Sequence, residues 1–415
     1  MQSDASWKEL NLGDVIELKR GYDLPKGKRS VGVIPIVSSS GISDFHSEAM
    51  VKGPGVVTGR YGTIGEVFYI DSDFWPLNTT LYVRDFKGSD PRFISYFLRT
   101  LDFQAYSDKG AVPGVNRNHL HTAKVRIPAL PVQKAIARVL DTLDSKIALN
   151  RRINQTLEAM AQAIFKSWFV DFDPVKAKVA AIEQGEDPLR AAMCAIAGKS
   201  NAEIDQMPRE HYDQLAATAA LFPEVMEESE LGKIPMGWIV SKVETLLSRL
   251  SAKTRYTKEQ VLEYGQTPVF EQGASILLGY HNGGSYYQAS SENPMFIFGD
   301  HTCVTRLSCQ PFDISQNVIP LQGKNRATTW VYYAVKEKQK FQEYRRHWME
   351  LISKDVVVAT ADICLDFSKK ITNIHLQIEA NERQMHSLRE LRDTLLPKLL
   401  SGELSINPMQ EANDD

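Results

Sequence analysis

Two long stretches of the chain have the hydrophobic pattern of helices that pack on another helix. Over 131–170, apolar residues recur at alternating spacings of four and three, with Asn150 in a gap between them. The stretch over 374–405 repeats the pattern and contains Asn381. An asparagine at the seam of a helix pair fixes its register. We therefore expect a pair of long helices packed on each other, in which Asn150 and Asn381 set the register, rather than two core helices of one globular domain.

The segment before each long helix has the pattern of short strands. Residues 55–70 and 295–307 contain β-forming residues in alternation with glycines and polar residues that suit tight turns. Helical patterns follow at 92–101 and at 328–348. The chain is therefore predicted to be of the mixed α+β class, with two strand-rich domains.

The two halves of the chain repeat one another. Trp238 follows Trp7 by 231 positions, and residues 377–391 match 146–160 at the same offset. Between these ends the match is loose and needs small insertions. A fixed offset at both ends indicates a tandem duplication, with a pseudo-twofold relation between copies whose central parts have diverged.

These patterns divide the chain into six predicted parts. They are a first strand-rich domain over 1–130, a first spacer helix over 131–170, an acidic connector with short helices over 171–237, a second strand-rich domain over 238–373, a second spacer helix over 374–405 and a disordered tail over 406–415.

Composition and charge exclude several classes of protein. The fractions of charged residues, 24%, and hydrophobic residues, 43%, are those of a globular chain rather than of a disordered or collagen-like one. The net charge is −3, yet 171–237 alone carries −7, while 1–130 carries +2 and 238–373 carries +3. Weakly basic domains permit phosphate contact without demanding it. We found no membrane-spanning run, no signal peptide and no CxxC pair, so we expect a reduced, cytoplasmic protein without membrane contact.

Motifs for catalysis are missing. The sequence has neither GxxxxGK[ST] nor GxGxxG, and the NPMF run at 293–296 lacks the second proline of an amino-methyltransferase motif. His301, Cys303 and Cys309 are too few and too widely spaced for a structural zinc site. We expect no catalytic residue, no metal and no cofactor bound by this chain.

Several runs strongly resemble the DNA-specificity (S) subunit of type I restriction–modification enzymes. The runs are GPGVVTGRYGTIGEVFYI (53–70), FWPLNTTLYV (74–83), AVPGVNRNHL (111–120), LEAMAQAIFKSWFVDFDPV (157–175) and QIEANERQMHSLRELRDTLLPKLLSGEL (377–404). The second copy departs from the first in that TADICLDFSKKI (360–371) stands where the first has an ALPVQKAIARVL-like lead-in to its helix.

The resemblance implies a function and partners. It implies two target-recognition domains held apart by an antiparallel pair of coiled-coil helices, which sets the gap. Each domain would read one half of a bipartite, asymmetric site in double-stranded DNA. The helices would dock two methyltransferase (M) subunits, which carry S-adenosylmethionine, and restriction (R) subunits, with ATP and Mg, would join them. A stand-alone two-headed DNA-binding regulator is the alternative, and a fused modification enzyme is disfavoured by the missing motifs.

Residues that suit base or phosphate contact occur in the predicted turns of both domains. The DNA-binding candidates are Lys26, Lys28, Arg29, Arg60, Tyr61, Thr63, Asn78, Thr79, Asn116, Arg117, Asn118 and His119 in the first domain, and Asp300, His301, Thr302, Arg306, Arg345 and Arg346 in the second.

Overall fold

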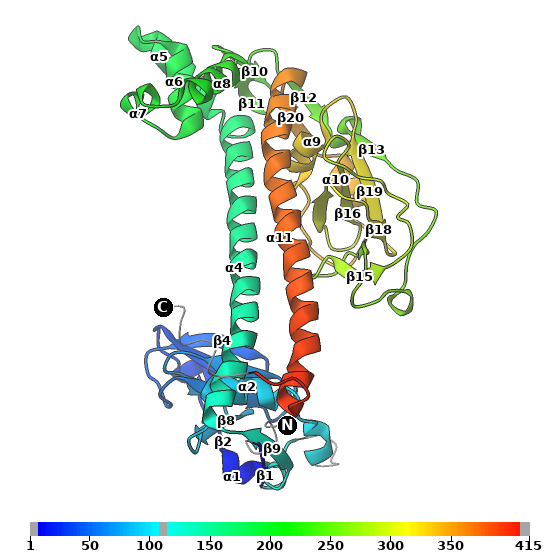
Figure 1. The fold of residues 1–415 in the computed structure, drawn as a ribbon. Helices are drawn as coiled ribbons and strands as arrows, with labels where there is room; N and C mark the ends of the chain where they lie inside the picture. The colour runs from blue at the N-terminus through cyan, green and yellow to red at the C-terminus, as the bar shows by residue number, and fades with distance from the viewer. Residues whose placement is uncertain (1–6, 108–113, 407–415) are drawn as a thin grey trace. The chain divides into compact units, whose positions relative to one another are not determined.

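The computed structural model describes residues 7–107 and 114–406, and it contains two compact units. Unit 1 is Met1–Ala148 with Ser387–Asp415, and unit 2 is Leu149–His386. Each unit combines short-stranded sheets with helices (Figure 1), so the predicted mixed fold class is confirmed. Of the tail predicted over 406–415, residues 407–415 lie outside the described residues.

The described strands of unit 1 form two sheets and a strand pair. The four-stranded sheet has the order β2 (Glu17–Arg20), β8 (Thr80–Asp85), β5 (Gly55–Gly59) and β6 (Val67–Ile70). The three-stranded sheet has the order β4 (Gly41–His46), β3 (Ile34–Ser38) and β7 (Trp75–Pro76), and β1 (Trp7–Asn11) pairs with β9 (Lys124–Pro128). The helices before the long one are α1 (Leu12–Val15), α2 (Pro91–Leu98) and α3 (Arg117–His121).

Unit 2 repeats this arrangement. Its four-stranded sheet has the order β13 (Leu247–Arg249), β19 (Val318–Gly323), β16 (Met295–Gly299) and β17 (Thr305–Ser308). Its three-stranded sheet has the order β15 (Leu277–His281), β14 (Thr267–Phe270) and β18 (Asp313–Ile314), and β12 (Ile239–Lys242) pairs with β20 (Asp355–Val358). Helices α9 (Thr328–Val335) and α10 (Trp348–Ile352) follow β19.

Strand registers show that the repeat extends to single residues. Gly59 is opposite Thr80 in the first repeat, and Gly299 is opposite Val318 in the second. The β3–β7 and β14–β18 pairs are both parallel, although every other strand pair in these sheets is antiparallel. The internal duplication predicted from the chain ends therefore also covers the divergent middles.

One predicted helix is much shorter than expected. The pattern over 328–348 predicts a single helix, but α9 ends at Val335 and α10 begins only at Trp348. The backbone leaves the helical conformation at Lys336, with φ −56° and ψ 132°, and Glu337 has a left-handed φ of 61°. The intervening residues form a loop, which contains Arg345 and Arg346.

The long helices are α4 (Leu130–Phe169) and α11 (Ala361–Ser401), and the boundary between the units passes through both. The second helix was expected only from 374. Its start at Ala361 lies 231 positions after Leu130, so the TADICLDFSKKI run is a helical lead-in despite its divergent sequence. Ile363, Phe367 and Ile371 explain this, because they recur every four residues and are all fully buried.

The two helices pack on each other within each unit. In unit 2, Asn150 bonds to Gln384, and Asn154, one turn later, bonds to Asn381, so the partner numbers fall as the α4 numbers rise. In unit 1, Arg392 Nη1 lies 2.7 Å from Asp144 Oδ1. These contacts confirm the predicted antiparallel pairing.

The hydrophobic core of each unit is completed by residues from the end of the long helix that belongs to the other repeat. In unit 1 the α11 residues Leu399 and Leu400 join the core around Leu140 of α4. In unit 2 the α4 residues Trp168 and Phe169 join the core around Trp330. Trp168 and Leu399 are again 231 positions apart, so equivalent positions of the two long helices complete the cores of the two units.

The connector folds as part of unit 2. It contains α5 (Asp173–Gln184), α6 (Pro188–Ala197), α7 (Asn201–Asp205) and α8 (Arg209–Ala220), followed by the hairpin of β10 (Met226–Ser229) and β11 (Gly232–Pro235). No hairpin was predicted there, because the strands are short and carry several charged residues. Among the residues that the structure describes, no helix is both long enough and apolar enough to cross a membrane.

Candidate nucleic-acid interface

Three turns that are distant in the sequence meet in unit 1. The backbone N–H of Arg60, after β5, donates to the carbonyl of Thr79, before β8, at 2.9 Å. The N–H of Val115 donates to the carbonyl of Arg60 at 3.0 Å. The predicted Arg60–Tyr61, Asn78–Thr79 and Asn116–His119 groups therefore lie on one cluster of turns.

Arg60 and the exposed Arg117 are the arginines of this cluster, and Arg60 is the one held against an aromatic ring. Its guanidinium lies 4.6 Å from the centre of the Tyr61 ring, a cation–π contact that uses none of its N–H donors. Arg60 has no ion pair with any described residue, and Thr63, in the same turn, is exposed. This arrangement leaves a pre-oriented guanidinium free for a phosphate or a guanine edge.

The other two groups are partly used by the protein. Asn78 donates from its side chain to Asp23, and the Asn116 side chain caps α3 by accepting from the N–H of Asn118 at 3.0 Å. Asn116 is therefore at least in part a structural residue. The exposed side chains of the third turn are those of Arg117, Asn118 and His119.

The predicted phosphate anchor separates into two parts. Lys26 and Lys28 are exposed on a single 3-10 turn. Arg29 instead lies 2.8 Å from Asp44 of β4 and has only 15% of its side chain exposed. The hydrogen bond from Arg29 lowers the pKa of the Asp44 carboxyl, as expected of a persistent ion pair.

In unit 2 the equivalent of Arg60 is an acid. The N–H of Asp300 donates to Asn317 at 2.9 Å, as Arg60 does to Thr79. The Asp300 carboxylate accepts from the N–H groups of His347 and Trp348, and so it orients the start of α10. His301 and Thr302 anchor the turn, because both hydrogen-bond to Gln272. These three candidates hold the turn in place.

Arg306 is paired with a glutamate of the long helix α11. Its Nη2 lies 2.5 Å from Oε2 of Glu382 on α11, its Nη1 lies 3.1 Å from Oε1, and its guanidinium covers the Phe270 ring at 4.8 Å. The side chain points at the long helix instead of at a ligand. Arg306 joins the second strand-rich domain to α11.

Arg345 and Arg346 are neighbours with different surroundings. Arg345 pairs with Glu350 and, at 2.7 Å, with Glu343. The Arg346 side chain is 81% exposed and its Nε lies 3.8 Å from Asp300. Only Arg346 therefore offers most of its donors to a ligand.

Four residues that were not predicted from the sequence lie around a hollow next to Arg346. The hollow has a volume of about 460 Å³, and its lining includes Arg249, Arg255, Gln316 and Asn317. The run SRLSAKTR over 248–255 is basic, and this charge could have indicated Arg249 and Arg255 as candidate site residues. Their meeting with the turn before β19 depends on the tertiary fold, which local sequence does not show.

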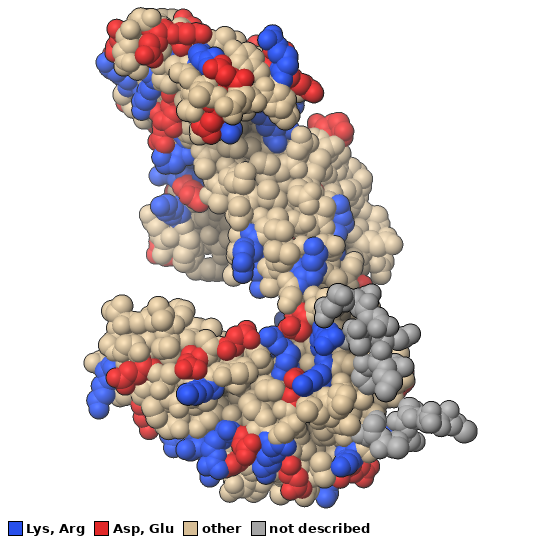
Figure 2. Space-filling model, turned by 60° about the vertical axis from the view of Figure 1, so that its left-hand side comes forward, with Lys and Arg blue, Asp and Glu red and all other residues tan. Residues whose placement is uncertain are grey.

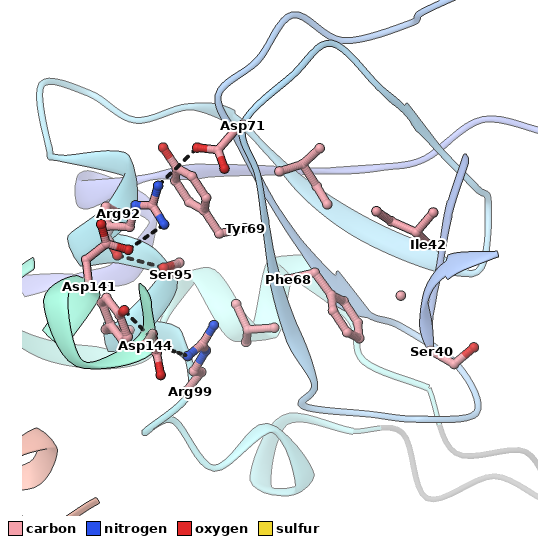
Figure 3. A pocket seen from close by; sticks show the side chains of 14 residues that line it. Ser40, Ile42, Phe68, Tyr69, Asp71, Arg92, Ser95, Arg99, Asp141 and Asp144 are labelled. Atoms are coloured by element: carbon pink, nitrogen blue, oxygen red, sulfur yellow. Dashed lines mark hydrogen bonds and ion pairs between the residues drawn. The ribbon is translucent and has the colours of Figure 1, made fainter. Parts of the chain in front are cut away.

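A second hollow, of about 500 Å³, lies in unit 1 and is drawn in Figure 3. Its charged groups face one another: Arg92 lies 2.7 Å from Asp141 and 3.0 Å from Asp71, and Arg99 lies 3.6 Å from Asp144. Two arginines paired with three carboxylates make a poor anion site. This network ties α2 to α4.

The register asparagines are in the predicted place, although they do not bond to each other. Asn150 is 1% exposed and donates to Gln384 Oε1 at 2.7 Å, and Asn381 is 7% exposed and donates to Asn154 Oδ1 at 2.7 Å. Asn154 also donates to the Ile378 carbonyl at 3.0 Å. Bonds that link particular residues across the seam oppose sliding of one helix along the other.

The thiols are poorly placed for chemistry. Burial raises the pKa of Cys303 to about 11 and the pKa of Cys309 to about 12, so neither is a ready thiolate. Among the described residues, no three or more His, Cys, Asp and Glu side chains are grouped to hold a metal ion. On the face that Figure 2 shows, acidic and basic side chains are mixed over both units.

Comparisons with known proteins agree with one another. The family model described as the type I restriction modification DNA specificity domain matches residues 5–159. The type I restriction enzyme HindI specificity subunit of Haemophilus influenzae is 26% identical, over 96% of this chain and all of its own length. The MjaIX specificity subunit of Methanocaldococcus jannaschii is 20% identical, over 90% of this chain and 82% of its own.

The fold also has a solved counterpart. The crystal structure of the type I restriction–modification S subunit from M. genitalium matches with a TM-score of 0.59 and covers 96% of this chain and 98% of its own. Because the two sequences are only 14% identical, this match concerns the fold alone.

Proposed function

We propose that this chain is a specificity subunit of the type I restriction–modification family, and so the DNA-recognition subunit of such a complex, because it is similar to such subunits over nearly its whole length. Each strand-rich domain would read one half of a bipartite, asymmetric site in double-stranded DNA. The observation that carries this proposal is the duplicated fold with divergent turns: the strand order is the same in both repeats, while Arg60 in one is replaced by Asp300 in the other. Two readers of unlike half-sites need a shared scaffold and different turns.

The long helices would perform the other two tasks. Since α4 and α11 are paired by specific hydrogen bonds, they form a suitable element to set the gap between half-sites. We propose that they also dock two methyltransferase subunits, through which restriction subunits join. The name of the HindI relative, a subunit of a restriction enzyme, supports a place in a larger assembly.

The chemistry would belong to the partners. We propose that this chain is not itself a catalyst and binds no cofactor, with S-adenosylmethionine on the methyltransferase subunits and ATP with Mg on the restriction subunits. The absence of phosphate-loop and dinucleotide motifs from the sequence supports this division. A cytoplasmic location follows from a function on cellular DNA.

The experiment is a mobility-shift titration with and without the methyltransferase subunits of the same system. The mixed charge on the face shown in Figure 2 and the small net charges of the two domains predict weak binding by the chain alone. Adding the methyltransferase should raise affinity and sequence selectivity together. Equal specific affinity in both titrations would contradict the proposal and would favour the stand-alone regulator.

A further inference from the structure

The hollow in unit 2 lies between the turn joining β18 to β19 and the start of α10. Gln316 and Asn317 stand on the turn, Trp348 and Met349 lie at the helix, and Arg249 comes from the end of β13. Its sides are therefore built from three segments that the fold brings together. The exposed side chains around it are Arg249, Gln316, Asn317, Arg346 and Met349.

Positive charge dominates the hollow. Arg249, Arg255 and Arg346 line it together with only one acid, Asp300. Arg249 contacts the Trp348 ring at 5.8 Å and has no ion pair with any described residue. The Asp300 carboxylate accepts hydrogen bonds from two backbone N–H groups. It also lies 3.8 Å from Arg346 Nε, so it orients the Arg346 side chain and leaves that side chain exposed.

Arg255 makes the turn rigid. Its Nη1 donates to the carbonyls of Ser315 and Val318, at 2.9 and 3.0 Å, and so it bridges the two ends of the turn. Asn317, between them, has a left-handed φ of 60°. Gln316 is consequently held at an exposed tip, and its amide has no hydrogen bond with any residue that the structure describes. An amide fixed in this way suits recognition of a base edge.

The first repeat shows what the equivalent turn does. Thr79 and Asn317 accept the same backbone bond, so Asn78 and Gln316 occupy equivalent positions at the turn tip. In the first repeat the neighbouring guanidinium is that of Arg60. In the second repeat Asp300 takes that place, and the guanidinium is supplied by Arg346 from the loop before α10.

From these observations, and resting on the proposed function, we propose that this hollow is the DNA-contacting site of the second repeat. Arg249 and Arg346 would bind backbone phosphates on either side of it, and Gln316 would hydrogen-bond to a base edge. Asp300 and Arg255 are positioning residues, the first for Arg346 and the second for Gln316.

The test uses the full chain in complex with its methyltransferase subunits. The probe is the duplex that the wild-type complex methylates, together with duplexes in which each base pair is replaced in turn, titrated at several salt concentrations. Arg249→Ala and Arg346→Ala should each weaken binding to all duplexes about tenfold, and each should reduce the salt slope by about one. Gln316→Ala should leave the salt slope unchanged, and its discrimination at one base pair should fall about tenfold.

Arg345→Ala is the matched control, because Arg345 is adjacent in the chain but pairs with Glu343 and Glu350. It should leave affinity, slope and discrimination unchanged. Thermal unfolding midpoints equal to wild type would show that the variants fold. The inference is overturned if the two arginine variants keep wild-type affinity and slope, or if Gln316→Ala keeps wild-type discrimination. If the wild-type complex itself selects no duplex, the proposed function fails instead.

Discussion

Arg306 of β17 and Glu382 of α11 form a two-pronged ion pair whose side chains are 25% and 34% exposed. The pair joins a strand of the second repeat to the long helix. Arg306 lies in β17, which is equivalent to β6 of the first repeat, and this pair gives it a structural role.

We predict that Arg306→Ala lowers the free energy of unfolding by about 2 kcal/mol, between the roughly 1 kcal/mol of exposed ion pairs and the ~3–5 kcal/mol lost when a buried one is broken. Urea unfolding measures this, and a double-mutant cycle with Glu382→Ala isolates the pair. Arg249→Ala, which breaks no ion pair within the described residues, should leave stability unchanged. Wild-type stability of Arg306→Ala together with altered DNA discrimination would contradict the assignment.

The sequence predicted most of the scaffold because the scaffold follows from local patterns. The alternation over 55–70 gave β5 and β6, and the helical pattern over 131–170 gave α4 nearly to the residue. The offset between Trp7 and Trp238 predicted a tandem duplication, and the equal strand orders of the two repeats agree with it. The start of α11 was missed because its lead-in resembles that of α4 only in apolar spacing.

The surroundings of the candidate residues could not be predicted from the sequence, since they depend on which distant groups meet. Arg306 is neutralised by Glu382, which is 76 positions away. Arg249 becomes a candidate DNA contact only because the turn that carries Gln316 folds next to it. The turn that carries Arg60 could be predicted, because its glycines and Tyr61 are adjacent in the sequence, and its contact with DNA stays a prediction.

The bond between Asn381 and Asn154 gives a second prediction. Asn381→Leu should destabilise the helix pair by about 1–3 kcal/mol, because it leaves a partly buried amide without its partner. The paired change Asn154→Leu with Asn381→Leu should recover most of this loss, since an apolar seam is favourable once both amides are gone. Urea unfolding of the three variants tests it. A double variant less stable than Asn381→Leu would show that the bond is not the main contribution.

The buried His375 should make the free energy of unfolding sensitive to acid. It is 5% exposed, its Nε2 lies 2.8 Å from the Tyr333 hydroxyl, and burial lowers its pKa to about 4. The unfolded chain therefore binds a proton that the folded chain rejects between pH of about 6.5 and about 4. The neutral, buried His375 therefore contributes about 3 kcal/mol to the free energy of unfolding. This contribution is fully present above a pH of about 6.5 and is lost as the pH falls toward about 4.

The measurement is the unfolding free energy between pH 4 and pH 7 or so for His375→Gln, with exposed His211→Gln as control. His375→Gln should flatten the pH dependence, and His211→Gln should retain it. The same slope in His375→Gln as in wild type would refute this account of His375.

The exchange of helix ends between the repeats predicts the behaviour of a half-chain. A fragment of residues 1–170 lacks Leu399 and Leu400, which complete the core of unit 1, but it contains the equivalent Trp168 and Phe169. Two fragments could each supply this end to the other, with Asn150 facing Asn154 of the second copy. We expect a dimer by sedimentation at low and high salt. A monomer at both ionic strengths would mean that α4 pairs only with α11.

Arg60 tests the first repeat. Arg60→Ala should cost about 1–3 kcal/mol of binding to the specific duplex and relax discrimination at one base pair, because a bidentate contact to guanine is lost. Arg84→Ala is the control, since Arg84 is paired with Glu17 away from the turns. A uniform loss on all duplexes with a smaller salt slope would assign Arg60 to a phosphate.

The most direct test of the division of labour is to map the sequence that the complex methylates with wild-type chain and with Arg60→Ala. The account predicts a bipartite wild-type site with a fixed gap, and a variant site relaxed in one half while the other half stays unchanged. A continuous wild-type site, or relaxation of both halves by this single substitution, would contradict the claim that each repeat reads its own half-site.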